Sequence, residues 1–237
     1  MTRKLLTAIS RANRGAARPA DHPVSVVAWP RGRDWGQRVP RMLCGLAVLA
    51  IAVVLALRAG LGLAPWDVLH QGLGELLGIP IGTTAILVGF VVLLGWIPLR
   101  ERPGLGTVAN MLFVGLGIDV LYPLVPSPSF LAVRIGFLGA SLLCFGIATG
   151  LYIGAGLGAG PRDGLMTSIA ARGVPLWLVR TVIEVTVLVI GALLGGTVGV
   201  GTVVLALGIG PAAHVCLHLL RVREPAQAPT GIGLSGE

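Results

Sequence analysis

A ten-residue motif that occurs twice carries much of the chemistry this chain could perform. Residues 60–69 are GLGLAPWDVL and residues 156–165 are GLGAGPRDGL, so six of the ten positions are identical at an offset of 96. Glycine lets a backbone break at a helix end and approach its neighbours closely. The motif glycines expected to do this are Gly60, Gly62, Gly156 and Gly158.

The proline and the aspartate of each copy predict the start of a short helix. Pro65 and Pro161 suit the first helical position, where no N–H donor is needed. Asp67 and Asp163 follow two residues later, where they would face the positive end of the helix dipole. Two interpretations stay open: the motifs begin short interfacial helices, or they begin half-helices whose N-termini form a site near the membrane midplane.

The charges of the motif indicate what such a site would bind. An empty helix N-terminus attracts anions, but an aspartate there offsets the dipole, so a cation, the amine of a zwitterion or a proton fits better than phosphate. Arg162 stands where the first copy has Trp66, so the two ends differ. His70 and Gln71 follow the first motif within one helical turn. The predicted solute or ion site therefore consists of Asp67, His70, Gln71, Arg162 and Asp163.

Other polar residues within the apolar runs are few, and each is a candidate for function. Arg180 and Glu184 have i, i+4 spacing and can pair on one face of a helix, either as a functional pair or as a structural ion pair near the cytoplasmic end. Asp119 aligns with His214 at an offset of 95, which suggests a proton relay; the alternative is that both reach interfacial water near helix ends. His214 also lies four residues before His218, but a third metal ligand is missing, so no metal is predicted.

Enzymatic chemistry has little support in this sequence. No Ser/His/Asp arrangement or HExxH motif is present, and the glycine-rich runs lack the Lys-Ser/Thr of a phosphate-binding loop. Three cysteines, Cys44, Cys144 and Cys216, lie far apart in apolar runs and form no metal or disulfide pattern. We therefore expect neither catalytic activity nor a cofactor.

Composition identifies the elements that must position these residues. Of 237 residues, 54% are hydrophobic and only 12% are charged, about half the charged fraction of soluble domains. The mean hydropathy is +0.88. These values exclude a soluble domain, a disordered chain and a disulfide scaffold. They predict an all-α polytopic membrane protein with six spans, at roughly 42–58, 80–98, 105–124, 133–153, 176–194 and 200–220.

The formal net charge of +8 is concentrated at one end of the chain. Residues 1–41 hold nine of the 18 Lys and Arg and account for +7. The tail precedes the first apolar run and is not a basic face on a folded domain, so nucleic-acid binding is not expected. The positive-inside rule instead predicts that both termini are cytoplasmic.

The internal duplication predicts the topology of the two halves. GLGTV at 104–108 matches GVGTV at 199–203 at an offset of 95. A repeat with three spans forces the second copy to be inverted, with segments 59–79 and 154–175 as short broken or re-entrant helices. The predicted organisation is a basic, disordered tail at 1–41, repeats at 42–125 and 126–222, and a flexible C-terminus at 223–237.

Several long stretches resemble the YczE-type (YczE/YyaS/YitT-like) family of bacterial membrane proteins. They include residues 60–73, residues 96–107 (WIPLRERPGLGT), residues 152–166 (YIGAGLGAGPRDGLM) and the runs VRTVIEV and GGTVGVGTV. The resemblance covers about residues 42–212. It implies a multi-pass protein of the bacterial inner membrane but supplies no activity or substrate.

Two functions from different classes follow from these observations. The first is a permease for a small solute, with its site between the repeats and without an ATPase motif of its own. The second is an accessory or scaffold protein that supports a membrane-bound assembly, without transport. The lipid bilayer is an expected partner in both cases, and a homo-oligomer or a partner subunit is compatible with either.

Overall fold

The computed structural model describes residues 35–220, and every element in that range is helical. The predicted flexible end at 223–237 lies outside this range, and so does the predicted disordered tail at 1–41 except for residues 35–41, which are helical. The helices are α2 (Trp35–Ala59), α3 (Pro65–Leu77), α4 (Ile81–Leu94), α5 (Trp96–Leu99), α6 (Leu105–Leu121), the 3-10 turn η2 (Tyr122–Leu124), α7 (Leu131–Gly154), α8 (Pro161–Ala170), α9 (Leu176–Leu193) and α10 (Val200–Leu220).

Six helical segments of this range are long and apolar enough to cross a membrane, as predicted. They are 35–59, 81–99, 105–124, 131–154, 176–193 and 200–220. The first begins at Trp35, seven residues before the predicted start, because the helix continues through Pro40 into the basic segment. The predicted all-α membrane fold is therefore confirmed, and the helix bundle contacts the lipid bilayer.

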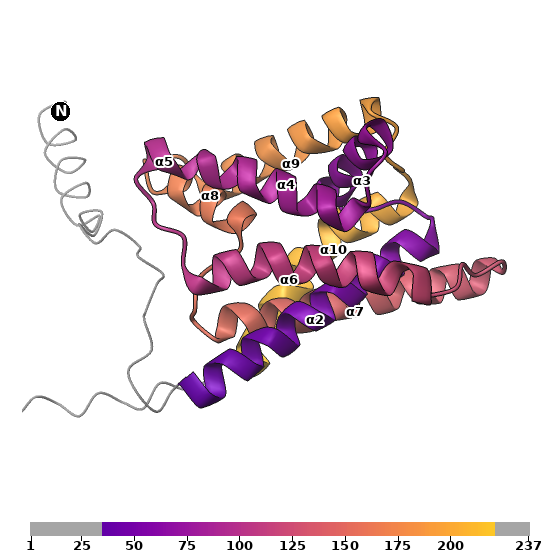
Figure 1. Ribbon diagram of the computed structural model, residues 1–237, viewed down its shortest axis with the longest axis horizontal. Coiled ribbons are helices and arrows are strands. Elements are labelled where there is room, and N and C mark those ends of the chain that lie inside the picture. Colours follow the sequence, from indigo (N-terminus) through magenta and orange to yellow (C-terminus); the bar gives the residue numbers. More distant parts are fainter. Residues whose placement is uncertain (1–34, 221–237) are drawn as a thin grey trace, which may run out of the picture.

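The helices form two layers, which are visible in Figure 1. In the lower layer α2 packs along α7, with α6 on its other side, and α10 packs on α7. The upper layer holds α3, α4, α8 and α9, and it joins the lower one mainly through α4 on α6. Helix α2 is central to the bundle. Of its most apolar 18-residue stretch, 56% is buried, compared with 6% of the corresponding stretch of α10.

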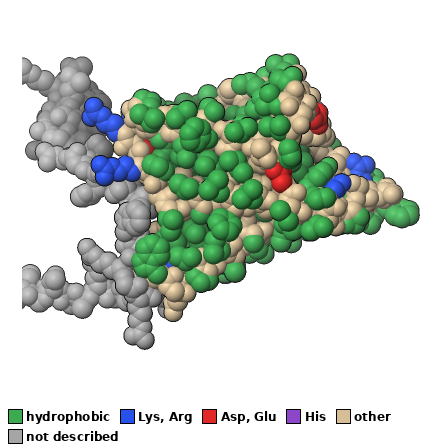
Figure 2. Space-filling view, viewed as in Figure 1, with side chains coloured by type: hydrophobic (Ala, Val, Ile, Leu, Met, Phe, Trp, Pro, Cys, Tyr) green, Lys and Arg blue, Asp and Glu red, His purple; other side chains and the backbone are tan. Residues whose placement is uncertain are grey.

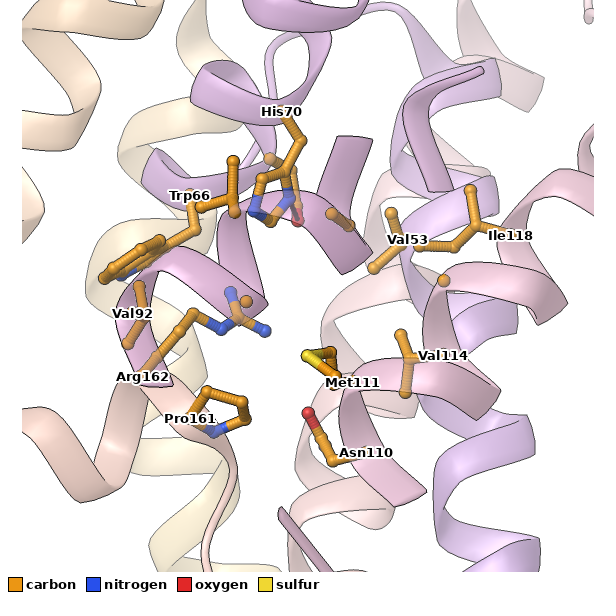
Figure 3. Close-up of a pocket in the computed structure, with 15 residues that line it drawn as sticks. Val53, Trp66, His70, Val92, Asn110, Met111, Val114, Ile118, Pro161 and Arg162 are labelled. Carbon is orange, nitrogen blue, oxygen red and sulfur yellow. Dashed lines mark ion pairs between the residues drawn. The ribbon is translucent and has the colours of Figure 1, made fainter. Parts of the chain in front are cut away.

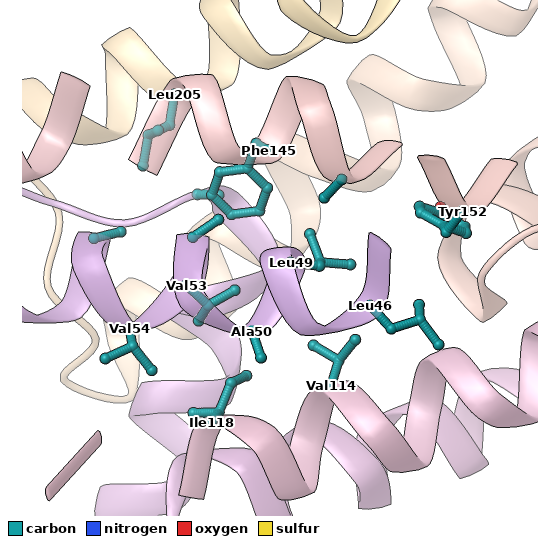
Figure 4. Close-up of a cluster of buried hydrophobic side chains, with 14 of the residues drawn as sticks. Leu46, Leu49, Ala50, Val53, Val54, Val114, Ile118, Phe145, Tyr152 and Leu205 are labelled. Carbon is teal, nitrogen blue, oxygen red and sulfur yellow. The ribbon is translucent and has the colours of Figure 1, made fainter. Parts of the chain in front are cut away.

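The main core lies where α2 meets α6 and α7. Leu46 and Val53 of α2 pack against Ile118 of α6 and Phe145 of α7 (Figure 4). A smaller cluster, with Trp66, Leu69, Met166, Val179 and Val187, joins α3, α8 and α9. The outer surface is also apolar, as Figure 2 shows, and in a bilayer lipid chains would cover it.

The two broken segments begin as the sequence predicts. α3 and α8 have 13 and 10 residues, too short to span a bilayer, and each begins with its motif proline. Before α3, Gly60 and Gly62 have φ of +58° and +115°; before α8, Gly156 and Gly158 have +68° and +121°. Backbone in this left-handed region favours glycine. The same backbone path therefore leads into both short helices.

Candidate functional site

Each motif loop is held by the start of a helix from the other half of the chain. Gly106 N–H at the start of α6 donates to the Leu157 carbonyl over 2.8 Å, and Gly201 N–H at the start of α10 donates to the Leu61 carbonyl over 2.7 Å. Two glycines without side chains allow this approach, since an added Cβ on either would lie within 2.9 Å of a backbone atom. This crossed pair of bonds fixes where α3 and α8 begin.

The starts of α3 and α8 consequently come close to each other. Trp66 and Arg162 occupy the same motif position, and the Arg162 Cζ lies 5.8 Å from the centroid of the Trp66 ring. The Trp96 indole N–H donates to the Pro161 carbonyl over 3.2 Å and so ties the start of α8 to the start of α5. Two helix N-termini from opposite halves of the chain thus point at one region.

A cavity lies at this region, bounded by α2, α3, α4, α6 and α8 (Figure 3). About 40 Å³ of this cavity is accessible to the centre of a water molecule. This space holds roughly three waters. Its walls are mainly apolar, and a few polar side chains converge on it. The lining residues that carry polar groups are Trp66, Asp67, His70, Asn110 and Arg162.

Asp67 is the most enclosed ionisable group on the cavity wall. It is 2% exposed, and its Oδ1 lies 3.6 Å from the His70 Nδ1. Its Oδ2 is buried and has no hydrogen-bond partner, and the buried Trp66 Nε1 also has none. Buried polar atoms normally have partners, so a free acceptor and a free donor beside one cavity require an explanation.

The opposite wall supplies a positive charge and an amide. Arg162 lines the cavity from α8, and within the described residues it forms no ion pair with Asp67. Asn110 of α6 is buried and packs against Gly160, where an added Cβ would lie 3.2 Å from the amide oxygen. The cavity therefore presents a carboxylate and a guanidinium that do not neutralise each other by direct contact.

Two of the five predicted binding residues lie elsewhere. The Tyr152 hydroxyl donates to Asp163 Oδ2 over 2.7 Å, which holds that carboxylate against α7 and off the cavity wall. The Gln71 amide oxygen accepts from Thr197 N–H over 2.9 Å, and its nitrogen donates to Glu75 over 3.0 Å. The structure thus brings together Asp67, His70 and Arg162, and it gives Asp163 and Gln71 other partners.

Asp119 and His214, the aligned pair, have different surroundings. Asp119 of α6 accepts from Gly82 N–H over 2.6 Å and from the N–H and hydroxyl of Thr83 over 2.8 and 2.7 Å. It therefore caps the start of α4, a structural role that favours neither of the two interpretations given above. His214 of α10 lies beside His218, with ring centroids 5.1 Å apart.

Arg180 and Glu184 form the predicted pair on α9, with Nε and Oε1 2.8 Å apart. Their side chains are 46% and 21% exposed, so this pair lies toward the outside of the chain. No cluster of three or more potential metal ligands occurs among residues 35–220.

Sequence reasoning missed three contributors: Asn110, the indole N–H of Trp66 and the hydroxyl of Tyr152. Asn110 could have been found as an isolated amide in an apolar run. Tyr152 could have been found through the repeat, because its counterpart at an offset of 96 is Ala56. That difference explains why Asp163 has a hydroxyl partner and Asp67 has none.

Comparison with known proteins identifies relatives over most of the chain. Residues 36–218 match a family model described as "Family of unknown function (DUF6198)". The chain is 38% identical over 180 residues to an uncharacterized protein of Haemophilus influenzae, covering 76% of this chain and 83% of the relative. It is 34% identical over 170 residues to the uncharacterized membrane protein YczE of Bacillus subtilis, covering 70% and 79%. Its identity to YyaS of Bacillus subtilis is 26% over 181 residues, covering 74% and 90%. No solved structure matches.

Proposed function

The chain belongs to the YczE-type membrane proteins of the DUF6198 family, and on that premise we propose that it transports a small solute across the bacterial cytoplasmic membrane. The observation that carries this proposal is the buried Asp67 carboxylate, whose Oδ2 has no partner and which lies on the wall of a cavity. An ionisable group inside a membrane bundle is costly and commonly marks a solute or ion pathway.

The position of the cavity supports transport more than a scaffold role. Residues of the first half line most of it, but Pro161 and Arg162 come from the second. Transporters built from repeats bind solute at the boundary between the repeats, with the N-termini of broken helices pointing at it. A scaffold has no need for a cavity on which polar side chains converge at such a boundary.

We further propose that the two halves are inverted repeats. Four equivalences support this: the crossed bonds to Leu61 and Leu157, the φ values of the motif glycines, the caps by Thr107 and Thr202, and the placement of two arginines. A Cβ on Gly60 would lie 3.0 Å from Arg134 Nη2, and one on Gly156 would lie 3.2 Å from Arg38 Nη1. Arg38 and Arg134 are themselves 96 residues apart.

The proposed orientation places both termini in the cytoplasm, which the positive-inside rule favours for the basic N-terminal tail. In this orientation α3 is entered from the outside and α8 from the cytoplasm. Transport would then consist of access to the cavity from alternate sides, without catalysis by the chain.

Single-cysteine labelling tests the topology. In a background without Cys44, Cys144 and Cys216, cysteines at 127 and 198 should react with a membrane-impermeant maleimide added outside intact cells. Cysteines at 101 and 174 should react only after the membrane is made permeable. Labelling of 127 and 174 from the same side would overturn the inverted arrangement.

Transport itself is tested with purified full-length protein. A thermal-shift screen of amino acids, amines and inorganic ions should find a solute that stabilises the wild type but not Asp67→Asn, and this solute should enter proteoliposomes. If every solute acts equally on both proteins, the accessory or scaffold hypothesis is favoured instead.

A further inference from the structure

We propose that the cavity binds a small zwitterion, with one ammonium and one carboxylate separated by about one carbon, as in glycine. This inference rests on the proposed function because it names the substrate class of the same site. It follows from three properties of the cavity: a negative pole, a positive pole, and a volume that limits the molecule between them.

Asp67 supplies the negative pole. The His70 Nδ1 lies 3.6 Å from Oδ1, whereas Oδ2 is buried and has no hydrogen-bond partner among the described residues. A ligand ammonium that donates to Oδ2 would satisfy this open acceptor. A charge-assisted hydrogen bond of this kind is about twice as strong as a neutral one.

Arg162 and Trp66 supply the positive pole. The guanidinium lies over the indole ring at 5.8 Å, and the indole Nε1 is buried without an acceptor. A planar carboxylate can accept from the two-pronged guanidinium and also from an indole N–H. Figure 3 shows Arg162 and His70 extending into the same space from opposite sides.

The balance of charge excludes simpler ligands. A lone cation would satisfy Asp67 but leave Arg162 and the Trp66 N–H unpaired, and a lone anion would leave Asp67 unpaired. Asp67 is buried whereas Arg162 is only partly buried, so the carboxylate carries the larger desolvation penalty when it is unpaired. A zwitterion satisfies both poles and enters without changing the net charge of the cavity.

The volume limits the size of the zwitterion. The narrow water-accessible space favours a zwitterion the size of an amino-acid backbone over one with a branched side chain. The apolar walls reinforce this limit, because Val88, Val92, Met111 and Val114 surround the cavity. Glycine should therefore bind, and valine should not.

Three matched probes test the proposal on the purified full-length protein. Glycine carries both charges, methylammonium only the positive one and acetate only the negative one. We expect glycine to bind at least tenfold more tightly than either of the others in a radioligand assay. Equal or tighter binding of methylammonium or acetate, or binding of valine as tight as that of glycine, would overturn the inference.

Variants of the two poles provide the second test. Asp67→Asn and Arg162→Gln should each weaken glycine binding at least tenfold, whereas Asp163→Asn, whose carboxylate is off the cavity wall, should retain it. Size-exclusion chromatography compares the folding of each variant with that of the wild type. Arg162→Lys, which keeps the charge, should bind glycine more tightly than Arg162→Gln. Equal losses in Asp67→Asn and Asp163→Asn would contradict the assignment of the site.

Exchange assays with the same purified protein distinguish a failure of this inference from a failure of the proposed function. If glycine binds but labelled glycine does not exchange across proteoliposomes, the ligand class stands and transport fails. If methylammonium or acetate exchanges in an Asp67-dependent way and glycine does not, transport stands and the zwitterion fails.

Discussion

The entries to α3 and α8 have the same backbone but different side chains. Both have two left-handed glycines, a proline at the first helical position and an aspartate two residues later. The side chains that follow differ: Trp66 corresponds to Arg162, and His70 to Met166. Asp67 has an oxygen without a partner, whereas Asp163 is bound by Tyr152.

The comparison shows that the two segments share a backbone framework but not the polar side chains around it. The glycines and the crossed hydrogen bonds fix where each short helix begins, and they are shared. The polar side chains around that framework are not shared, so the cavity is formed beside α3 with one arginine supplied by α8. Substitutions in the shared framework should therefore destabilise the fold from either half, whereas substitutions of the polar side chains should have unequal effects on the site.

The largest effect is expected at the motif glycines. Gly62→Ala places a Cβ 2.6 Å from Thr202 Oγ1 and 2.7 Å from Gly199 N at a φ of +115°, whereas at Gly158 the nearest atom is 3.2 Å away. Backbone strain of about 1–3 kcal/mol applies to both, and overlap adds about 1–3 kcal/mol at Gly62 only. Thermal unfolding in detergent should rank Gly62→Ala below Gly158→Ala and both below the wild type.

Gly139→Ala is the matched control, because nothing lies within 4 Å of its Cβ position in the middle of α7. It should be neutral or slightly stabilising. Equal melting temperatures for Gly62→Ala and Gly158→Ala would show that the closer contact of position 62 with the other half of the chain adds nothing to the loss of stability.

The next effect concerns the cap of α4. Asp119→Ala removes three hydrogen bonds, from Gly82 N–H and from both donors of Thr83. Loss of an N-cap costs about 1–2 kcal/mol. His214→Ala, at the aligned position in the second half, should cost much less. A comparable loss of stability in His214→Ala would show that the two positions are structurally equivalent after all.

A smaller effect is expected at the hydroxyl that distinguishes the two aspartates. Tyr152→Phe removes the 2.7 Å hydrogen bond to Asp163, and because Asp163 is only partly buried, water can replace the lost donor and the cost should be about 0.5–1.5 kcal/mol. In the Asp163→Asn background the same substitution should have less effect, as a double-mutant cycle would measure. An additive cycle would mean that the bond contributes nothing to stability.

The smallest effect is expected for Arg180 and Glu184, which correspond to Ala85 and Gly89 of the cavity wall. Partly exposed i, i+4 pairs contribute about 0.3–0.5 kcal/mol. Arg180→Gln should destabilise more than the double variant Arg180→Gln/Glu184→Gln, because it leaves a carboxylate unpaired on a spanning helix. Thermal unfolding measures this difference in stability. Arg180→Gln should bind glycine as tightly as the wild type does. A loss of glycine affinity in this variant would place the pair in the site.

The spans and the starts of the short helices could be predicted from the sequence because each depends on local properties. Apolar length sets the spans, and glycine, proline and aspartate at fixed spacing set α3 and α8. The position of Tyr152 against Asp163, or of Gln71 against Thr197, depends instead on which helices pack together. The aligned Asp119 and His214 show the same limit, because equal places in two repeats do not imply equal neighbours.

The crossed hydrogen bonds also affect the order in which the molecule is completed during synthesis. Leu61 emerges from the ribosome early, but its partner Gly201 is made about 140 residues later. Leu157, by contrast, finds Gly106 already present. The loop before α8 can therefore close as soon as it is made, while the loop before α3 must wait for α10. The helix that carries Asp67 is thus secured last, so an incomplete chain inserts its spans before it possesses a finished binding site.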